Sequence, residues 1–348
     1  MSPMSVQAPS AVLLIRPHFF TPNPETAHDN AFQSVDAGHD AALIAEAAYA
    51  EVTRVAETLE SRGIVVHLFD DDGPGRPDSV FPNNWISTHA GGHVALYPMH
   101  APNRRTERRG DIVEMLKQRY RVQDVVDYSG LELDDVFLEG TGAMVLDHAG
   151  RIAYVARSRR ADPIALERFC TNFGYEPIVF DAADESGRPI YHTNVLMCIA
   201  TDFALVGLDL IQSSSRRSHV VERLTAQDRE VIALDREQIR NFAGNAIELH
   251  GPGGRMLVLS RRALDCLTAG QRSVIERSCT ILPLDVPTIE LAGGSIRCML
   301  AGIHLDRRGA PSLSATSLST ASLSTQAVSL AATPHERSAS RTEPGLAV

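Results

Sequence analysis

Residues 142–180 read GAMVLDHAGRIAYVARSRRADPIALERFCTNFGYEPIVF and contain one complete structural unit. Two apolar runs, Gly142–Leu146 and Arg151–Ala156, flank a turn that ends in glycine, which predicts a β-hairpin. An amphipathic helix is expected over 162–173, and a third strand over Pro177–Phe180. The stretch therefore predicts a hairpin, a helix and a strand, in that order.

The same unit recurs along the chain at a spacing of roughly 50 to 60 residues. The other hairpins are expected at Asn84–His89 with His93–Pro98, Val195–Ile199 with Ala204–Gly207, and Ala246–His250 with Met256–Ser260. The other helices are expected at 39–61, 105–119, 215–225 and 261–277, and the other third strands at Ile64–Phe69, Val122–Asp127, Val231–Leu234 and Thr280–Pro283. Leu300–His304 is expected to pair with Ala11–Arg16 and complete a fifth unit.

Repeats of this kind indicate blades around an axis rather than one open sheet. The expected fold class is therefore α/β, a five-bladed pseudo-symmetric α/β propeller of hairpin–helix–strand units. A Rossmann sheet would need strand–helix alternation without hairpins, and the first strand is not followed by GxGxxG.

Composition limits the class of protein. Of the 348 residues, 44% are hydrophobic and 22% are charged, as in globular proteins. The chain has 33 basic and 43 acidic residues, a net charge of −10, which argues against nucleic-acid and anionic-membrane partners. It contains no apolar run of membrane-spanning length, and its first residues do not read as a signal peptide. We therefore expect a cytoplasmic protein.

The two ends of the chain differ from its body. Residues 309–348 are rich in Ser, Thr and Ala, repeat SLST imperfectly and contain no aromatic residue. Such a segment buries too little to offset the entropy of ordering it. We therefore expect a disordered tail at 309–348, a disordered N-terminus at 1–10, and one folded domain at 11–308.

The cysteines are odd in number and form no CxxC pair, so neither a disulfide framework nor a zinc ribbon is indicated. They are Cys170, Cys198, Cys266, Cys279 and Cys298. Cys298 differs from the others because it follows Gly293 and Gly294 and adjoins Arg297, a cation that favours a thiolate. The other four are expected to be buried core residues with no chemical role. The same interpretation, a buried free cysteine, remains open for Cys298.

Polar residues occupy corresponding loops of successive units. His192 precedes a strand, where a general acid or base would sit, and Glu139 lies beside glycines in LEGTG. A third polar turn before the only tryptophan contains Asp78, Asn83 and Asn84. Each also fits an ordinary turn or a hydrogen-bonded side chain. If the units ring an axis, however, these loops and Cys298 converge and meet the requirements of covalent catalysis.

These motifs resemble those of the arginine deiminase, dimethylarginine dimethylaminohydrolase and amidinotransferase superfamily, whose fold is the pentein. They are PDSVFPNNW (77–85), LEGTGAM (138–144), YHTN (191–194) and GGSIRCM (293–299), with RPHFFTPNPETAHDNAFQ (16–33) and FAGNAIEL (242–249) also similar. The resemblance implies a five-bladed α/β propeller with a central active site. It implies that Cys298 is the nucleophile, that His192 is the acid and base, and that Glu139 holds His192 or the substrate. No metal or organic cofactor is implied.

The chain departs from the guanidine-cleaving members at Asn84, where they carry a carboxylate that pairs with a guanidinium. An asparagine amide both donates and accepts, which suits a neutral ureido group. The Phe-Pro-Asn-Asn-Trp sequence resembles the citrulline-utilization hydrolase branch. Arg160 falls where relatives carry an arginine for the substrate carboxylate, and Asp78 is available for the ureido nitrogens.

The expected function is therefore a cysteine-dependent hydrolase of a ureido or guanidino amino acid, with citrulline converted to ornithine, carbon dioxide and ammonia. Amidino transfer and arginine or dimethylarginine deiminase-type hydrolysis remain open. So does a non-catalytic relative that binds an amino acid or a protein partner. The expected partner is a small molecule rather than nucleic acid or a membrane, and a homodimer is also allowed.

Overall fold

The computed structural model describes residues 7–34 and 40–309, and within them it contains five three-stranded mixed sheets. The first sheet contains β1 (Ala11–Pro17), β2 (Val65–Asp71) and β15 (Ala301–Gly302). The second contains β3 (Ile86–His89), β4 (His93–Leu96) and β5 (Asp124–Asp127), and the third β6 (Met144–Asp147), β7 (Ile152–Ala156) and β8 (Glu176–Phe180). The fourth contains β9 (Met197–Ile199), β10 (Phe203–Val206) and β11 (Glu230–Ala233), and the fifth β12 (Ile247–Gly251), β13 (Gly254–Ser260) and β14 (Thr280–Leu284).

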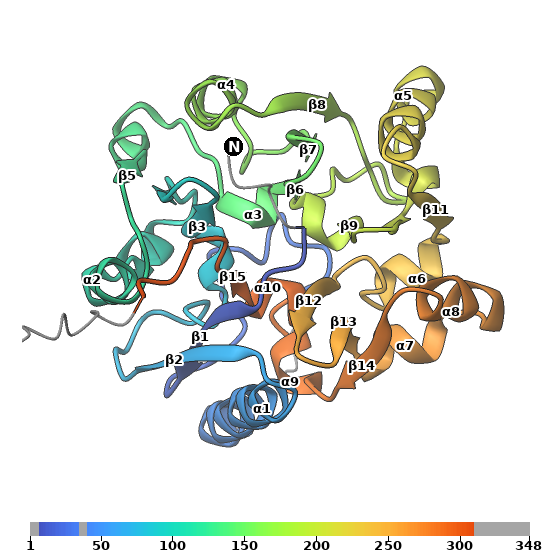
Figure 1. Ribbon diagram of the computed structural model, residues 1–348. Helices are drawn as coiled ribbons and strands as arrows, with labels where there is room; N and C mark the ends of the chain where they lie inside the picture. Colours follow the sequence, from blue (N-terminus) through green and yellow to red (C-terminus); the bar gives the residue numbers. More distant parts are fainter. Residues whose placement is uncertain (1–6, 35–39, 310–348) are drawn as a thin grey trace, which may run out of the picture. The chain divides into compact units, whose positions relative to one another are not determined.

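All five sheets have one topology. The central strand pairs antiparallel with one neighbour and parallel with the other, as β7 does with β6 and β8. The first sheet is closed by the two ends of the domain, because β15 pairs antiparallel with β1. The predicted hairpin–helix–strand unit and the pairing of the two ends are thus confirmed. The five sheets lie around a common centre (Figure 1).

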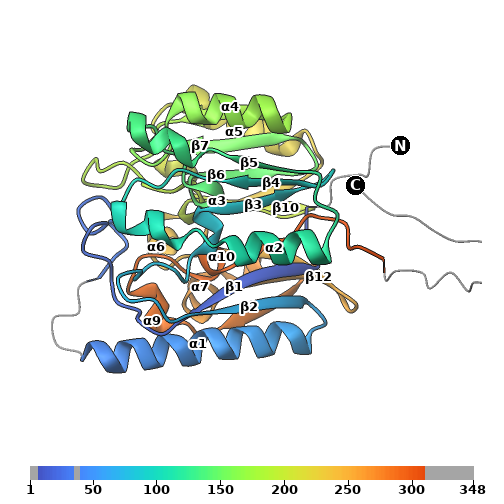
Figure 2. The ribbon, with the colours of Figure 1, turned by 90° about the vertical axis from the view of Figure 1, so that its left-hand side faces the viewer.

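The longer helices lie outside the sheets (Figures 1 and 2). They are α1 (Ala41–Ser61), α2 (Gly110–Arg119), α4 (Pro163–Phe173), α5 (Ser214–Thr225), α7 (Arg261–Cys266) and α8 (Ala269–Glu276). Shorter helices are α3 (Gly140–Ala143), α6 (Arg236–Arg240), α9 (Pro287–Glu290) and α10 (Ile296–Met299). On α1, Val52, Val55 and Leu59 are buried against the first sheet, which is the amphipathic packing that the sequence predicts. None of the helices in the described ranges has the length and apolar character needed to cross a bilayer.

Three predicted elements differ in the structure. The helix expected at 261–277 is two helices, because Thr268 caps a new one through a capping box with Gln271. The helix expected at 105–119 is a 3₁₀ helix, η2 (Pro102–Glu107), followed by α2. The last strand, expected at Leu300–His304, is shorter and contains only Ala301 and Gly302, which pair with Leu13 and Val12.

The prediction of a disordered N-terminus is wrong for residues 7–10. The Gln7 side-chain amide donates to the Leu146 and Ile199 carbonyls at 3.1 and 3.0 Å, so it joins two sheets. Residues 1–6 and the tail beyond Gly309 lie outside the described residues.

Buried polar contacts also join neighbouring units. Arg229 and Asp147 form a fully buried ion pair between the fourth and third sheets. His148 contacts the Tyr175 hydroxyl at 3.0 Å and stacks on His304. Burial lowers the pKa of His148 well below its ordinary value, and nearby positive groups lower it further. His148 is therefore neutral in the folded protein.

This neutral histidine predicts a pH effect on stability. A pKa below the unfolded value gives stability that is present above about pH 6.5 and lost as the pH falls. Between pH 7.5 and 5.5, we expect the free energy of unfolding of wild type to fall by about 1.4 kcal/mol more than that of His148→Gln. Urea unfolding at both pH values measures this. His250→Gln, on an exposed histidine, should show the wild-type loss, and equal losses for all three proteins would contradict the prediction.

Candidate active site

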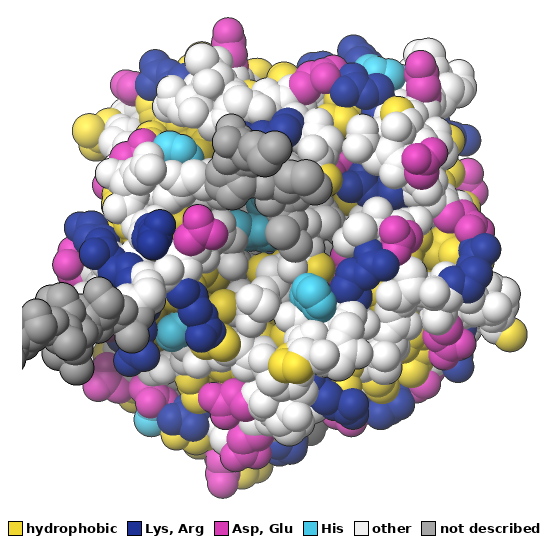
Figure 3. Space-filling view, viewed as in Figure 1, with side chains coloured by type: hydrophobic (Ala, Val, Ile, Leu, Met, Phe, Trp, Pro, Cys, Tyr) yellow, Lys and Arg dark blue, Asp and Glu magenta, His cyan; other side chains and the backbone are white. Residues whose placement is uncertain are grey.

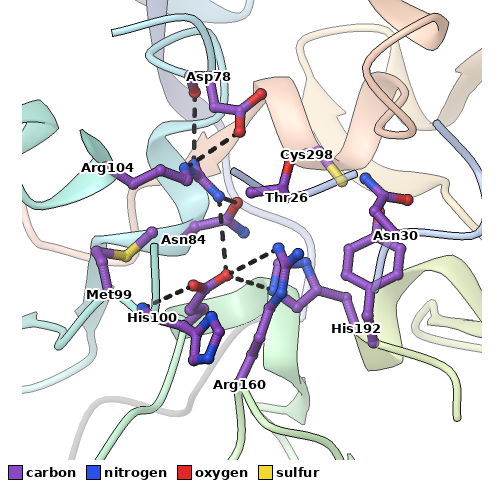
Figure 4. A network of polar contacts seen from close by, with 12 residues as sticks. Thr26, Asn30, Asp78, Asn84, Met99, His100, Arg104, Arg160, His192 and Cys298 are labelled. Atoms are coloured by element: carbon purple, nitrogen blue, oxygen red, sulfur yellow. Dashed lines mark hydrogen bonds and ion pairs between the residues drawn. The ribbon is translucent and has the colours of Figure 1, made fainter. Parts of the chain in front are cut away.

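The candidate residues lie in turns that precede the first strand of four of the five units. Asn83 and Asn84 lie in η1 (Pro82–Asn84) before β3, and Glu139 lies directly before α3 and β6. His192 precedes η4 (Thr193–Val195), which leads into β9, and Cys298 lies in α10 before β15. The structure therefore places these residues in equivalent positions, as the sequence predicts, and Figure 4 shows several of them around one part of the interior.

Glycine is required where these turns meet. A Cβ on Gly142 would lie 2.2 Å from Asn84 Nδ2 and 2.9 Å from His192 Nδ1. Gly140 has a φ of +44° and would bring a Cβ to 2.4 Å from the Asn83 carbonyl oxygen. The glycines of LEGTG therefore allow the Glu139, Asn84 and His192 turns to pack together.

Glu139 is fully buried and lies among three cationic or ionisable side chains. Its Oε2 is 2.8 Å from His192 Nε2, 3.4 Å from Arg160 Nη1 and 3.7 Å from Arg104 Nη1. Its Oε1 accepts a hydrogen bond from the His100 backbone N–H. Burial alone would raise the pKa of Glu139, but Arg160, His192 and Arg104 hold it below its ordinary value. The carboxylate is therefore ionised.

This carboxylate sets the state of His192. Burial lowers the pKa of His192 to about 4, although Glu139 opposes the shift. The ring is therefore neutral at neutral pH, and the ionised Glu139 places its proton on Nε2. The unprotonated Nδ1 lies on the side of Gly142 and Asn84, where it can accept a proton.

Cys298 is buried and its sulfur accepts two hydrogen bonds from amides. Asn194 Nδ2 and Asn245 Nδ2 each lie 3.2 Å from Sγ. Burial raises the pKa of the thiol, whereas the Asn245 and Asn194 amides and the charge of Arg297 lower it. No stabilising donor offsets burial at Cys170, where the pKa is raised to about 12. Unlike Cys170, Cys298 therefore has amide donors and a nearby cation that favour a thiolate.

The amide of Asn84 is fixed at both ends. Its Oδ1 accepts from Arg104 Nη1 at 2.9 Å, and its Nδ2 donates to Asn83 Oδ1 at 3.1 Å. Asp78 Oδ2 accepts from Asn23 at 2.8 Å. Two buried polar atoms nearby, Asp78 Oδ1 and Asn83 Nδ2, have no hydrogen-bond partner in the described structure. Such atoms are costly without a partner, so a polar ligand is the natural one.

Arg160 is expected from the sequence to bind the substrate carboxylate, but its guanidinium contacts carboxylates of the protein itself. Its Nη1 is near Glu139 and its other nitrogens contact Asp29. The guanidinium thus already pairs with two carboxylates of the protein, and a substrate carboxylate would have to compete with Asp29. Its role with substrate stays a prediction.

Several residues of the site were not singled out from the sequence. Asn194 and Asn245 lie inside YHTN and FAGNAIEL, so their motifs signalled them without showing what they contact. No sequence feature singles out Arg104, because it lies in a basic stretch that is typical of a protein surface. In the structure it is 2% exposed and pairs with Glu107 through Nε and Nη2.

The segment at 18–34 lies across the site. Asn23 donates to Asp78, Asp29 pairs with Arg160, and Asn30 donates to the Ala292 carbonyl. Asn30 also lies close to the glycines before Cys298, because a Cβ on Gly293 would meet its side-chain amide at 2.5 Å. These contacts hold the segment against the buried candidate residues Asp78 and Arg160.

Comparison with known proteins identifies the family. The profile of the family described as N,N dimethylarginine dimethylhydrolase, eukaryotic, matches residues 16–305. The chain belongs to this family. It is therefore a member of the pentein superfamily of arginine deiminase, dimethylarginine dimethylaminohydrolase and amidinotransferase-type enzymes, which confirms the resemblance seen in the sequence.

Solved structures share the fold at low sequence identity. The N-terminal domain of ArgZ, an arginine dihydrolase from the ornithine-ammonia cycle in cyanobacteria, is 16% identical with a TM-score of 0.64, covering 84% of this chain and 97% of that one. AgrE with L-arginine is 17% identical with a TM-score of 0.65, covering 86% and 40%. A dimethylarginine dimethylaminohydrolase adduct is 15% identical with a TM-score of 0.57, covering 84% and 99%. No curated protein matches the chain.

The contact at Gly142 predicts the effect of a substitution. Gly142→Ala would force the Asn84 and His192 side chains apart, and overpacking of this kind costs about 1–3 kcal/mol. Urea unfolding of the variant against wild type measures the loss. Gly110→Ala is the matched control, because a Cβ there meets nothing within 4 Å. Equal stability of the two variants would contradict the described contact.

Proposed function

We propose that this protein is a cysteine-dependent hydrolase that cleaves citrulline to ornithine, carbon dioxide and ammonia. Its family and the neighbours ArgZ and dimethylarginine dimethylaminohydrolase support hydrolysis at a guanidino-type carbon. The finer choice of a neutral ureido substrate rests on the amide at Asn84 and on the cations around it.

The observation that carries this choice is the contact of Arg104 with Asn84. Arg104 Nη1 donates to the Asn84 carbonyl oxygen, and one of the two N–H groups of the amide donates to Asn83 Oδ1, which leaves the other N–H for a ligand. A nitrogen donor suits the carbonyl of a ureido group. A guanidinium has no acceptor and would gain nothing from this donor.

The charges of the site support the same choice. Arg104 lies 3.6 Å from Asp78, 3.0 Å from Glu107 and 3.7 Å from Glu139, so a protein guanidinium already pairs with these carboxylates. Arg160 is a second buried cation beside Glu139. A substrate guanidinium would enter beside both arginines and be repelled, whereas a neutral ureido group would not.

The mechanism follows from the protonation states. Nδ1 of His192 takes the proton of the Cys298 thiol, and the thiolate attacks the ureido carbon. The bond from that carbon to the ornithine nitrogen breaks, the nitrogen receives the proton from His192, and a carbamoyl group remains on sulfur. His192 then activates water, which displaces the thiolate. The released carbamic acid gives carbon dioxide and ammonia.

Within this scheme the neighbouring residues position the reacting groups. Glu139 holds the tautomer of His192, and the Asn194 and Asn245 amides stabilise the thiolate. Asp78 is proposed to accept from the ureido nitrogens through its unpartnered Oδ1. We also interpret the five sheets as blades of a closed propeller, which explains why the turns before their first strands meet.

A product assay tests the substrate. Purified protein is incubated with citrulline, arginine, agmatine and methylated arginines, and ornithine, citrulline and ammonia are quantified. We expect ornithine and ammonia from citrulline and little turnover of arginine. Turnover of arginine with citrulline inert would overturn the ureido assignment, and a product that forms only with an added amine would indicate amidino transfer.

Replacement of the nucleophile tests the covalent mechanism. Cys298→Ala is expected to lower turnover by at least about 1,000-fold, because it removes the attacking atom. Cys266→Ala is the matched control, since this thiol lies in α7 and contacts the Ala263 carbonyl. Activity retained by Cys298→Ala would refute the mechanism.

The role of Asn84 is tested by adding a charge there. Asn84→Asp removes the amide donor and supplies a carboxylate, so the ratio of arginine to citrulline turnover should rise by roughly 100-fold. Asn172→Asp makes the same change on the exposed face of α4 and should leave the ratio unchanged. A ratio unaffected by Asn84→Asp would show that this residue does not select the substrate.

A further inference from the structure

A small cavity adjoins the Cys298 turn at Arg297, and Cys298, His192 and Glu139 are not part of its lining. It has a volume of about 40 Å³, and its polar lining includes Arg297, Thr88, Thr141, His148 and Glu248. The face seen in Figure 1 is hollowed near its centre (Figure 3). The lining of the cavity also includes Gln7 and Pro9, which precede β1.

Arg297 is partly buried and differs in its partners from the buried arginines of the described structure. Arg104, Arg160 and Arg229 each pair with a carboxylate. Arg297 donates from Nη1 to the Leu300 carbonyl at 3.0 Å, and no carboxylate in the described ranges forms an ion pair with it. A cation that is partly removed from water and has no counter-charge is unfavourable.

The other charged residue of the lining does not supply that counter-charge. The Glu248 carboxylate accepts from the backbone and hydroxyl of Thr201 at 2.8 and 2.6 Å. Its Oε1 also lies 3.6 Å from Arg255 Nη1. The charge of the Glu248 carboxylate is therefore balanced by Thr201 and Arg255 rather than by Arg297. The remaining N–H groups of Arg297 are available to a ligand.

We propose that this cavity binds a small inorganic anion, of the size of chloride, on the Arg297 guanidinium. The charge of Arg297 selects an anion, and the volume limits its size. One water molecule needs roughly 10–15 Å³ of such space, so the cavity holds an ion of one or a few atoms and excludes an amino acid. The proposal does not depend on which substrate the active site takes.

Chloride binding to the full chain tests the proposal. Chloride is titrated against gluconate at constant ionic strength, and the line width of the ³⁵Cl resonance is followed. We expect saturable broadening with wild type that bromide reverses by competition. No saturable broadening, or broadening that bromide leaves unchanged, would overturn the proposal without the need for any variant.

Variants then locate the site. Arg297→Gln should weaken chloride binding at least 10-fold, and Arg297→Lys, which keeps the charge, should bind more tightly than Arg297→Gln. Arg168→Gln removes an equal charge from the exposed face of α4 and should bind as wild type does. Wild-type affinity in a folded Arg297→Gln variant would overturn the assignment, and so would a loss of equal size in Arg168→Gln.

Discussion

The buried carboxylate of Glu139 is the interaction on which the rest of the site depends. It is removed from water and contacts His192, Arg160 and Arg104, which come from three separate segments of the chain. A buried carboxylate stays ionised only where such partners surround it. The same charge fixes the proton of His192 on Nε2, so the packing of the units and the protonation state of His192 have one cause.

The repeated unit explains why so few residues make a site. Each unit enters its first strand through a short turn or helix, and these positions meet at the centre of the domain. Small residues such as Gly142 allow the turns to approach, and polar residues at the same positions then face one another. The units differ mainly in which side chain they supply: an amide at Asn84, a carboxylate at Glu139, an imidazole at His192 and a thiol at Cys298.

The repeat and its strands could be predicted because alternation, turn glycines and helical spacing are local signals. Arg104 could not, because a surface arginine and one that pairs with Glu107 and Asn84 inside the domain read alike in a sequence. The contacts of Arg160 were missed for the same reason, since Asp29 is distant along the chain. The helix divides at Thr268 because Thr268 and Gln271 form a capping box. This is a local sequence pattern, from which the division could have been predicted.

The central claim is that Cys298 carries a carbamoyl group derived from citrulline. It is tested most directly by mixing protein and citrulline, quenching in acid within one turnover, and measuring the masses of the cysteine-containing peptides. We expect a carbamoyl group on the Cys298 peptide and on no other cysteine peptide. Release of ornithine while Cys298 stays unmodified throughout the turnover, or a carbamoyl group on a different cysteine, would contradict it.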